Sequence, residues 1–119
     1  MTWLMIFLGG GLGSICRFGL TKIVPSSDFS WATLAANFLA SFILGYLISS
    51  ELSKGMELNA KVFLMTGFCG GFSTFSTFTA EAFRNFQNGQ HGIALLYIAS
   101  SIVFCLVGLF LGFQLAKHV

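Results

Sequence analysis

Four long apolar stretches alternate with short polar connections along the chain. They cover residues of about 3–22, 31–50, 62–83 and 92–116. A membrane-spanning helix needs roughly 20 mainly apolar residues, so each stretch is long enough to cross a bilayer. The single proline, Pro25, is expected to end the first helix, because proline lacks an amide hydrogen and restricts the residue before it. The pattern predicts an all-α integral membrane protein with four transmembrane helices, in one domain of residues 1–119.

Composition supports a lipid-facing surface. Only 8% of the residues are charged and 55% are hydrophobic, whereas a soluble domain carries about 25% charged residues. The net charge of +2 is spread over the chain without a basic cluster, so no nucleic-acid partner is expected. The first stretch has neither a basic segment before it nor a small-x-small cleavage site, and it is therefore expected to be a retained helix rather than a signal peptide.

The positive charges do not favour either orientation in the membrane. Four spans would put both termini on one side. That side would carry Lys54, Lys61 and Lys117, and the opposite side Arg17, Lys22 and Arg84. Three charges against three give no positive-inside bias. Either Arg17 lies within the membrane and a weak bias is missed by counting, or the protein inserts in both orientations; the second interpretation is favoured.

Small residues recur at four-residue spacing. The rows are Gly9 and Gly13, Gly67 and Gly71, Gly108 and Gly112, and Thr33, Asn37, Ser41 and Gly45. Such rows let helices approach closely in lipid. A four-helix bundle fills its own interior with side chains, so any pathway for a solute is expected between subunits of an oligomer.

The most unusual segment is residues 66–81 in the third stretch. Three glycines within five residues, Gly67, Gly70 and Gly71, precede a run of hydroxyl side chains. Each glycine costs a helix interior about 1 kcal/mol, and serine and threonine compete for backbone hydrogen bonds. One interpretation is a glycine-rich packing face on an unbroken helix. The favoured one is a broken helix, whose freed carbonyls at membrane depth need protein, water or an ion as a partner.

Polar side chains on three stretches indicate a small anion as the transported species. Phe75 and Phe78 share a helix face just beyond the predicted break. The polar rows are Ser73, Thr77 and Glu81, then Tyr97, Ser101 and Cys105, then Asn37 and Ser41. Most of these groups donate hydrogen bonds, and the edge of a phenyl ring carries positive partial charge. Such ligands replace the hydration of an anion without trapping it as a fixed cation would.

Other functions are less consistent with the sequence. A dual-topology multidrug antiporter needs a membrane-embedded carboxylate, but Glu81 lies near a helix end. A non-transporting assembly subunit would carry no ion flux. An enzyme is not expected, because His91 and His118 lack partner residues. Cys16, Cys69 and Cys105 form neither a disulfide framework nor a metal site by their spacing.

Three segments resemble the Fluc/CrcB fluoride channel family: Gly9 to Phe18, Thr33 to Asn37, and Gly67 to Phe78 together with Glu81. The resemblance implies passive, selective export of fluoride, and so fluoride resistance, across the cell (inner or plasma) membrane. It also implies an antiparallel dual-topology homodimer, with two pores at the subunit interface and one structural sodium ion (Na+) at the dimer centre.

The resemblance also implies roles for individual residues. The carbonyls of Gly70 and Ser73 would bind sodium. The pore residues would be Phe75, Phe78, the Asn37 amide that contacts fluoride, the polar-track residues Ser76, Thr77, Tyr97 and Ser101, the vestibule arginine Arg17, and Glu81 near the pore end. The sequence departs from the family pattern in three places: Ser73 replaces a usual threonine, Cys105 stands where a hydroxyl can occur, and residues 38–40 after Asn37 lack the glycine that the family often has there.

Overall fold

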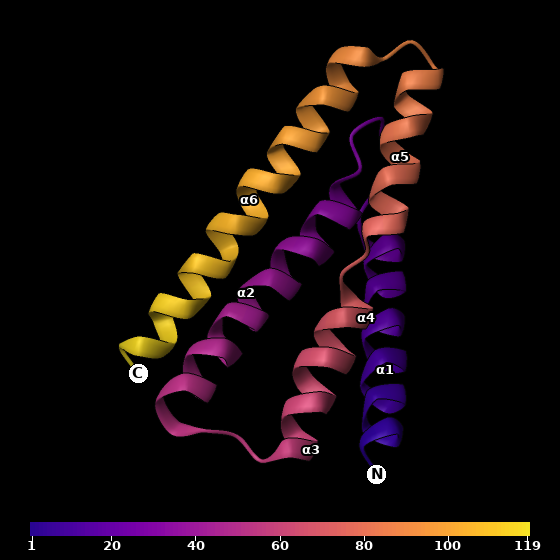
Figure 1. Ribbon diagram of the computed structural model, residues 1–119. Helices are drawn as coiled ribbons and strands as arrows, with labels where there is room; N and C mark the ends of the chain where they lie inside the picture. The colour runs from indigo at the N-terminus through magenta and orange to yellow at the C-terminus, as the bar shows by residue number, and fades with distance from the viewer.

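The computed structural model describes all residues, 1–119, and consists of helices joined by short connections (Figure 1). Its elements are α1 (Thr2–Ile23), α2 (Trp31–Lys54), α3 (Leu58–Lys61), the π-helix η1 (Val62–Cys69), α4 (Gly70–Phe72), α5 (Phe75–Gln87) and α6 (His91–Lys117). Glycines with positive φ end two of these helices: Gly55 follows α2 with φ 76°, and Gly89 follows α5 with φ 77°. Glycine adopts this conformation without the steric penalty that a side chain brings.

Three helices are long and apolar enough to cross a membrane, namely α1, α2 and α6, with mean hydropathies of 1.5, 1.6 and 2.5. The third predicted span, residues 62–83, is not one helix. Its residues form η1 and α4, then an extended pair, Ser73 and Thr74, and then the first part of α5, while the short helix α3 lies directly before the span. The predicted break is therefore present, but it lies at the first hydroxyl residues, whereas the glycines before it remain helical. A π-helix within this segment was not predicted.

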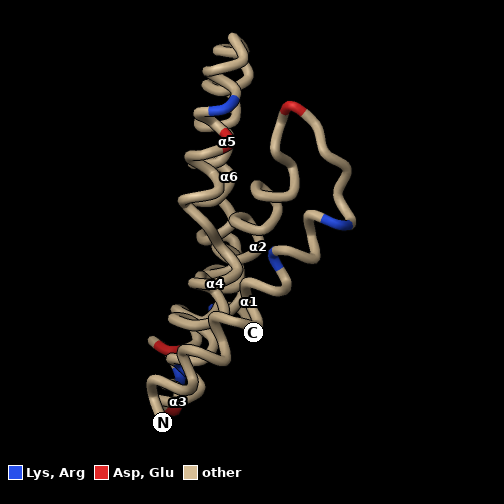
Figure 2. Tube along the Cα trace, turned by 90° about the vertical axis from the view of Figure 1, so that its right-hand side faces the viewer, with Lys and Arg blue, Asp and Glu red and all other residues tan.

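Two helix pairs make up the molecule, and they diverge towards one end (Figure 1). In the first pair α1 lies along η1 and α4, and in the second α2 lies along α6. The N- and C-termini lie at the same end as the connection from α2 to α3, as four passes predict. The few charged residues gather in short stretches, two of which lie around α3 and on α5, and long uncharged lengths of the trace run between these stretches (Figure 2).

Glycines bring the backbones together within each pair. A Cβ atom at Gly9 would collide with the Phe63 carbonyl oxygen of η1, and one at Gly71 would collide with the Gly10 carbonyl oxygen of α1. In the second pair, a Cβ atom at Gly112 would collide with the Phe42 carbonyl oxygen of α2. The expectation that small-residue rows serve close packing is confirmed within the chain. The favoured interpretation of residues 66–81, a broken helix, is confirmed at Ser73 and Thr74, and the unbroken helix of the alternative is wrong. Only the packing role of that alternative holds, because Gly67 and Gly71 lie against α1.

Few residues are buried inside the chain, only 21 of 119. Large apolar side chains lie outside, including Trp3 at 85% exposure, Phe7 at 74% and Leu106 at 67%. Exposing apolar area to water costs about 25 cal/mol per Å², so this surface requires a lipid environment. The chain is a multi-pass membrane protein.

Candidate functional site

The break in the third span is shaped by its own side chains. Ser73 (φ −83°, ψ 157°) and Thr74 (φ −152°, ψ 120°) are extended. The Ser73 amide and hydroxyl both donate to the Cys69 carbonyl oxygen, at 3.1 and 2.8 Å. The Thr74 hydroxyl oxygen then accepts from the Thr77 amide at 3.1 Å and caps the start of α5. A threonine hydroxyl is a favourable helix N-cap, so the sequence at the break starts the new helix.

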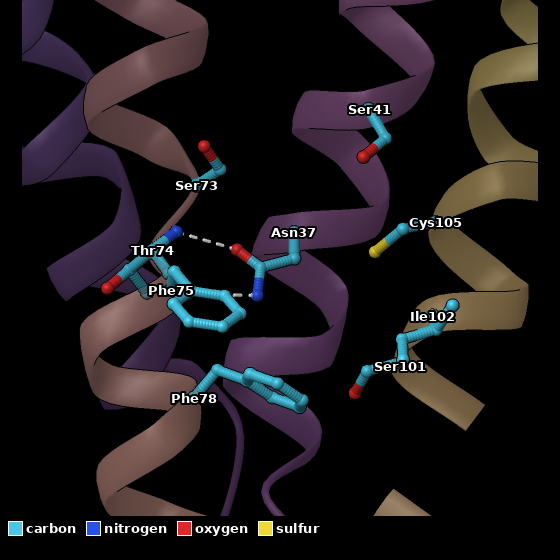
Figure 3. Close-up of a pocket in the computed structure, with 9 residues that line it drawn as sticks. All are labelled: Asn37, Ser41, Ser73, Thr74, Phe75, Phe78, Ser101, Ile102 and Cys105. Carbon is cyan, nitrogen blue, oxygen red and sulfur yellow. Dashed lines mark hydrogen bonds between the residues drawn. The ribbon is translucent and has the colours of Figure 1, made fainter. Parts of the chain in front are cut away.

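Asn37 of α2 holds the backbone of the break in place through two hydrogen bonds (Figure 3). Its Oδ1 accepts from the Thr74 amide at 2.7 Å, and its Nδ2 donates to the Thr74 carbonyl oxygen at 3.2 Å. Backbone groups inside a membrane need such partners, because no water is available to them. An asparagine amide carries two N–H hydrogens, so one remains available to a ligand beside the break.

Of the backbone carbonyls near the end of α4, one accepts a side-chain hydrogen bond and two lose their helical partners. The Gly71 carbonyl oxygen accepts from Arg17 Nε at 3.1 Å. In a continuous α-helix the Gly70 carbonyl would bond the Thr74 amide, and the Ser73 carbonyl would bond the Thr77 amide. Both amides are engaged by side chains instead. The Gly70 and Ser73 carbonyls are therefore released from helical pairing, in positions where they could hold a cation.

A groove of about 260 Å³ runs beside the break, between α2, α5 and α6 (Figure 3). It is lined by Asn37, Ser41, Ser73, Thr74, Phe75, Phe78, Ser101, Ile102 and Cys105. We call it the phenylalanine groove. Phe75 is 77% exposed and Phe78 is 8% exposed, and their ring centroids lie 5.7 Å apart at an interplanar angle of 47°. No charged side chain lines this groove.

Ser101 supplies the most informative polar atom of the phenylalanine groove. The residue is 5% exposed, and its Oγ has no hydrogen-bond partner. A buried polar group without a partner costs about 1–3 kcal/mol. Water or an ion in the groove would remove this cost, which makes Ser101 a candidate ligand.

A second polar cluster lies one helical turn away. Tyr97 Oη donates to Glu81 Oε1 at 2.8 Å, and Thr33 Oγ1 donates to Glu81 Oε2 at 3.0 Å. We call Thr33, Glu81 and Tyr97 the carboxyl cluster. Tyr97 is 0% exposed, with its ring between Phe29 and Phe78 at centroid distances of 5.3 and 5.1 Å. The cluster joins α2, α5 and α6.

Two smaller grooves flank these clusters. One, of about 200 Å³, is lined by Thr33, Thr77, Glu81, Arg84 and residues of the connection from α1 to α2. The other, of about 140 Å³, is lined by Ala40, Ser41, Leu44, Met65, Cys69, Gly70 and Ser73. Ser41 and Ser73 line both this groove and the phenylalanine groove.

The structure thus groups some of the predicted site residues and separates others. Asn37, Ser73, Phe75, Phe78 and Ser101 share the phenylalanine groove. Thr77 and Glu81 line the groove near the connection from α1 to α2, and Gly70 lines the smallest one.

The remaining three predicted residues lie outside these grooves. Tyr97 is enclosed within the chain, and Arg17 is half-buried against α4. The Ser76 hydroxyl lies 3.3 Å from the Thr74 hydroxyl on the exposed side of α5.

Sequence reasoning missed Thr74 and Ile102 as lining residues and Thr33 as a partner of Glu81. Thr74 directly precedes Phe75, in the hydroxyl run that the sequence singled out. Thr33 lies four residues before Asn37 and hence on the same face of α2. The sequence indicates Thr33 as a small packing residue and as part of a family-like segment, and its spacing from Asn37 was a further signal for the site.

Known proteins match the chain over nearly its whole length. A sequence model of the family described as CrcB-like protein, Camphor Resistance (CrcB), matches residues 4–113. The fluoride-specific ion channel FluC of Pyrococcus abyssi is 42% identical over 98% of this chain and 97% of its own length. The protein of the same name from a strain of Thermus thermophilus is 40% identical over 95% of this chain and 93% of its own.

These relatives are named as ion channels rather than as enzymes, in agreement with the expectation from the sequence. The match covers the two glycine-packed helix pairs, the break at Ser73 and Thr74, and the phenylalanine groove. The chain therefore belongs to the CrcB-like protein family.

Proposed function

We propose that this protein is a fluoride-selective ion channel that exports fluoride passively from the cell and so confers fluoride resistance. The observation that carries the proposal is the phenylalanine groove. There an amide donor of Asn37, the unpartnered Ser101 hydroxyl and two phenyl rings meet without any charged side chain. The names of the relatives support fluoride as the ion. The cell (inner or plasma) membrane is the proposed location.

The groove suits an anion that must be bound and then released. Hydroxyl and amide hydrogens replace water around an anion, and the positive edges of phenyl rings add a weak attraction. A lysine or arginine among these ligands would bind the ion more tightly and slow its departure. Conduction requires ligands strong enough to replace hydration and weak enough to release the ion, and uncharged donors and phenyl edges suit this requirement.

The proposal includes an antiparallel dual-topology homodimer with two pores. The phenylalanine groove is open along one side of the chain, and Phe75 is 77% exposed there. A second copy packed on this side would enclose one groove from each chain. The equal count of basic residues at the two ends supports opposite orientations.

Labelling tests the dual topology. Single cysteines introduced at the Lys54 and Arg84 positions, in a background without the native cysteines, are each expected to react from both sides of the membrane. Labelling of each position from only one side would contradict it.

A structural sodium ion at the dimer centre is part of the same proposal. The Gly70 and Ser73 carbonyls are released from helical pairing, and Gly70 is exposed, so a neighbouring copy could approach it. Two carbonyls from each chain would give four oxygen ligands, and hard cations prefer oxygen. When bound, the ion would hold the two breaks together.

Efflux from proteoliposomes tests the function directly. The purified protein is reconstituted in liposomes loaded with potassium fluoride, and a fluoride-selective electrode follows the efflux once valinomycin balances the charge. We expect rapid fluoride release, and no comparable release of chloride from matched liposomes. Absence of flux would favour an assembly subunit, whereas flux that requires a proton gradient would favour an antiporter.

A further inference from the structure

Cys105 gives the phenylalanine groove a chemical property that anion conduction does not use. Its thiol extends from α6 towards α2 across the groove, opposite Ser41 and Asn37 (Figure 3). The other two cysteines are placed differently. Cys16 is exposed on α1 outside the three grooves, and Cys69 is 3% exposed beneath the smallest groove.

A second observation points to a ligand at the same place. Ser101, one helical turn before Cys105, is 5% exposed and has an Oγ without a hydrogen-bond partner. The groove thus contains a polar group that needs a partner and, one turn away, a sulfur atom that binds soft metal ions. The lining is uncharged, so a neutral metal complex meets no repulsion from it.

We propose that the phenylalanine groove binds a soft, thiophilic metal ion through Cys105 Sγ, and that this ion blocks conduction. Mercuric chloride is the probe that we consider. The Cys105 thiol forms an S–Hg bond while one Hg–Cl bond breaks, and one proton and one chloride ion are released. The chloride that stays on mercury can accept a hydrogen bond from the Ser101 hydroxyl. No oxidation or reduction takes place.

Block follows from the size and position of the adduct. The groove has a volume of about 260 Å³ and is lined at the same level by Asn37, Phe75 and Phe78. A mercury atom with its chloride would occupy the space beside these residues and remove the Ser101 hydroxyl from the reach of a passing ion. Block rests on the proposed channel function, whereas binding of mercury at Cys105 does not.

The first readout is the mass of the purified dimer or monomer in detergent after treatment with mercuric chloride and removal of excess reagent. A Cys16→Ser, Cys69→Ser variant, which retains Cys105, is expected to gain one mercury per chain. Cys105→Ser is expected to carry one mercury fewer per chain than the parent protein. Equal adduct masses for the parent and Cys105→Ser would overturn the binding proposal.

The second readout is fluoride efflux, with each protein compared with its own untreated sample. Mercury at the groove is expected to lower the flux of the parent and of the Cys16→Ser variant by about tenfold or more, because a pore conducts only while its ligands are free. Dithiothreitol should restore it. Cys105→Ser should keep most of its own untreated flux in mercury.

The two readouts separate this inference from the proposed function. Inhibition of Cys105→Ser to the same degree as the parent, or an adduct at Cys105 that leaves the flux of the parent unchanged, would refute block at this site. If the untreated parent carries no fluoride, the channel proposal fails and block fails with it. The adduct masses still decide whether Cys105 is the metal ligand.

Discussion

The carboxyl cluster and the phenylalanine groove are built from the same three helices, one helical turn apart, yet they differ in hydrogen bonding. In the cluster, both oxygens of Glu81 accept a hydrogen bond, from Thr33 and from Tyr97. In the groove, the Ser101 hydroxyl is buried without a partner, and Asn37 retains one free N–H hydrogen. A cluster whose polar groups are all paired stabilises the packing of helices, whereas the unpaired groups of the groove are the ones that would bind the ion under the proposed function.

The largest effect on fluoride efflux is expected from substitutions of Asn37, because this residue both holds the break in place and lines the phenylalanine groove. Asn37→Ala would leave the amide and the carbonyl of Thr74 without partners, at about 1–3 kcal/mol for each group. We expect fluoride efflux to fall to the level of protein-free liposomes and the thermal unfolding temperature to drop.

Asn37→Asp serves as the matched variant for this prediction. It keeps an acceptor for the Thr74 amide but loses the donor to the Thr74 carbonyl and introduces negative charge. We expect it to be silent too, because an anion is repelled. Parental flux through either variant would show that Asn37 neither shapes nor lines the pathway.

The next effect concerns the two aromatic rings. Phe75→Ile retains bulk and apolar character but removes the positive ring edge, so we expect flux to collapse while the protein remains a monodisperse dimer in detergent. Phe78→Ile is expected to reduce flux as well. It should also lower stability, because Phe78 is 8% exposed and packs with Leu34, Ala82 and Tyr97.

Phe110→Ile is the control, since Phe110 is 58% exposed and lies outside the three grooves. Similar-volume apolar substitutions usually cost less than about 1.5 kcal/mol, so its flux should stay near that of the parent. If Phe75→Ile and Phe78→Ile conduct like the parent while dimeric, the rings serve packing alone, and the ion must follow the hydroxyl groups.

Two substitutions that each remove one hydroxyl group distinguish the role of the carboxyl cluster from that of the phenylalanine groove. Tyr97→Phe removes one donor to Glu81 and should lower the free energy of unfolding by about 1–2 kcal/mol. Ser101→Ala removes a buried hydroxyl that has no partner, so stability should be unchanged or slightly higher. Flux, in contrast, should fall severalfold in Ser101→Ala. The reverse pattern, with flux sensitive only to Tyr97, would place the pathway in the carboxyl cluster.

The smallest effect is expected from removal of sodium. The Gly71 carbonyl oxygen accepts a hydrogen bond from Arg17, whereas the Gly70 and Ser73 carbonyl oxygens would have sodium as their partner under the proposed function. An ion at ten times its dissociation constant contributes about 1.4 kcal/mol to the state that binds it. Replacing sodium by N-methyl-D-glucamine should therefore reduce the dimer fraction, measured by light scattering. Unchanged assembly and flux after prolonged exchange would contradict the site.

Short-range features of this molecule could be predicted from the sequence, and features that depend on how helices pair could not. The apolar stretches, the break after Gly71 and the shared face of Phe75 and Phe78 follow from residue types and helical spacing. The contact of Asn37 with Thr74 depends on the relative position of α2 and the break, 37 residues apart along the chain. Hydropathy and spacing do not determine that position.

The same limit explains the placement of Tyr97 and Ser101. They lie four residues apart on α6 and looked like members of one polar row. Their environments differ because Phe29 and Phe78 enclose Tyr97, and Glu81 accepts from its hydroxyl, whereas the next turn faces the groove. A row of hydroxyls on one helix says where polar groups lie, but the neighbouring helices decide which of them stay free.

The interruption at Ser73 and Thr74 also has a consequence for biogenesis. The 13 residues of α5 extend about 20 Å, and the helical residues before the break extend little further, whereas the hydrocarbon core of a bilayer is about 30 Å thick. Neither half can cross the membrane alone, while α1, α2 and α6 can each do so by length and composition. We therefore expect the third segment to enter the bilayer late, recruited by the glycine face of α1, so that insertion and folding of this region are a single event.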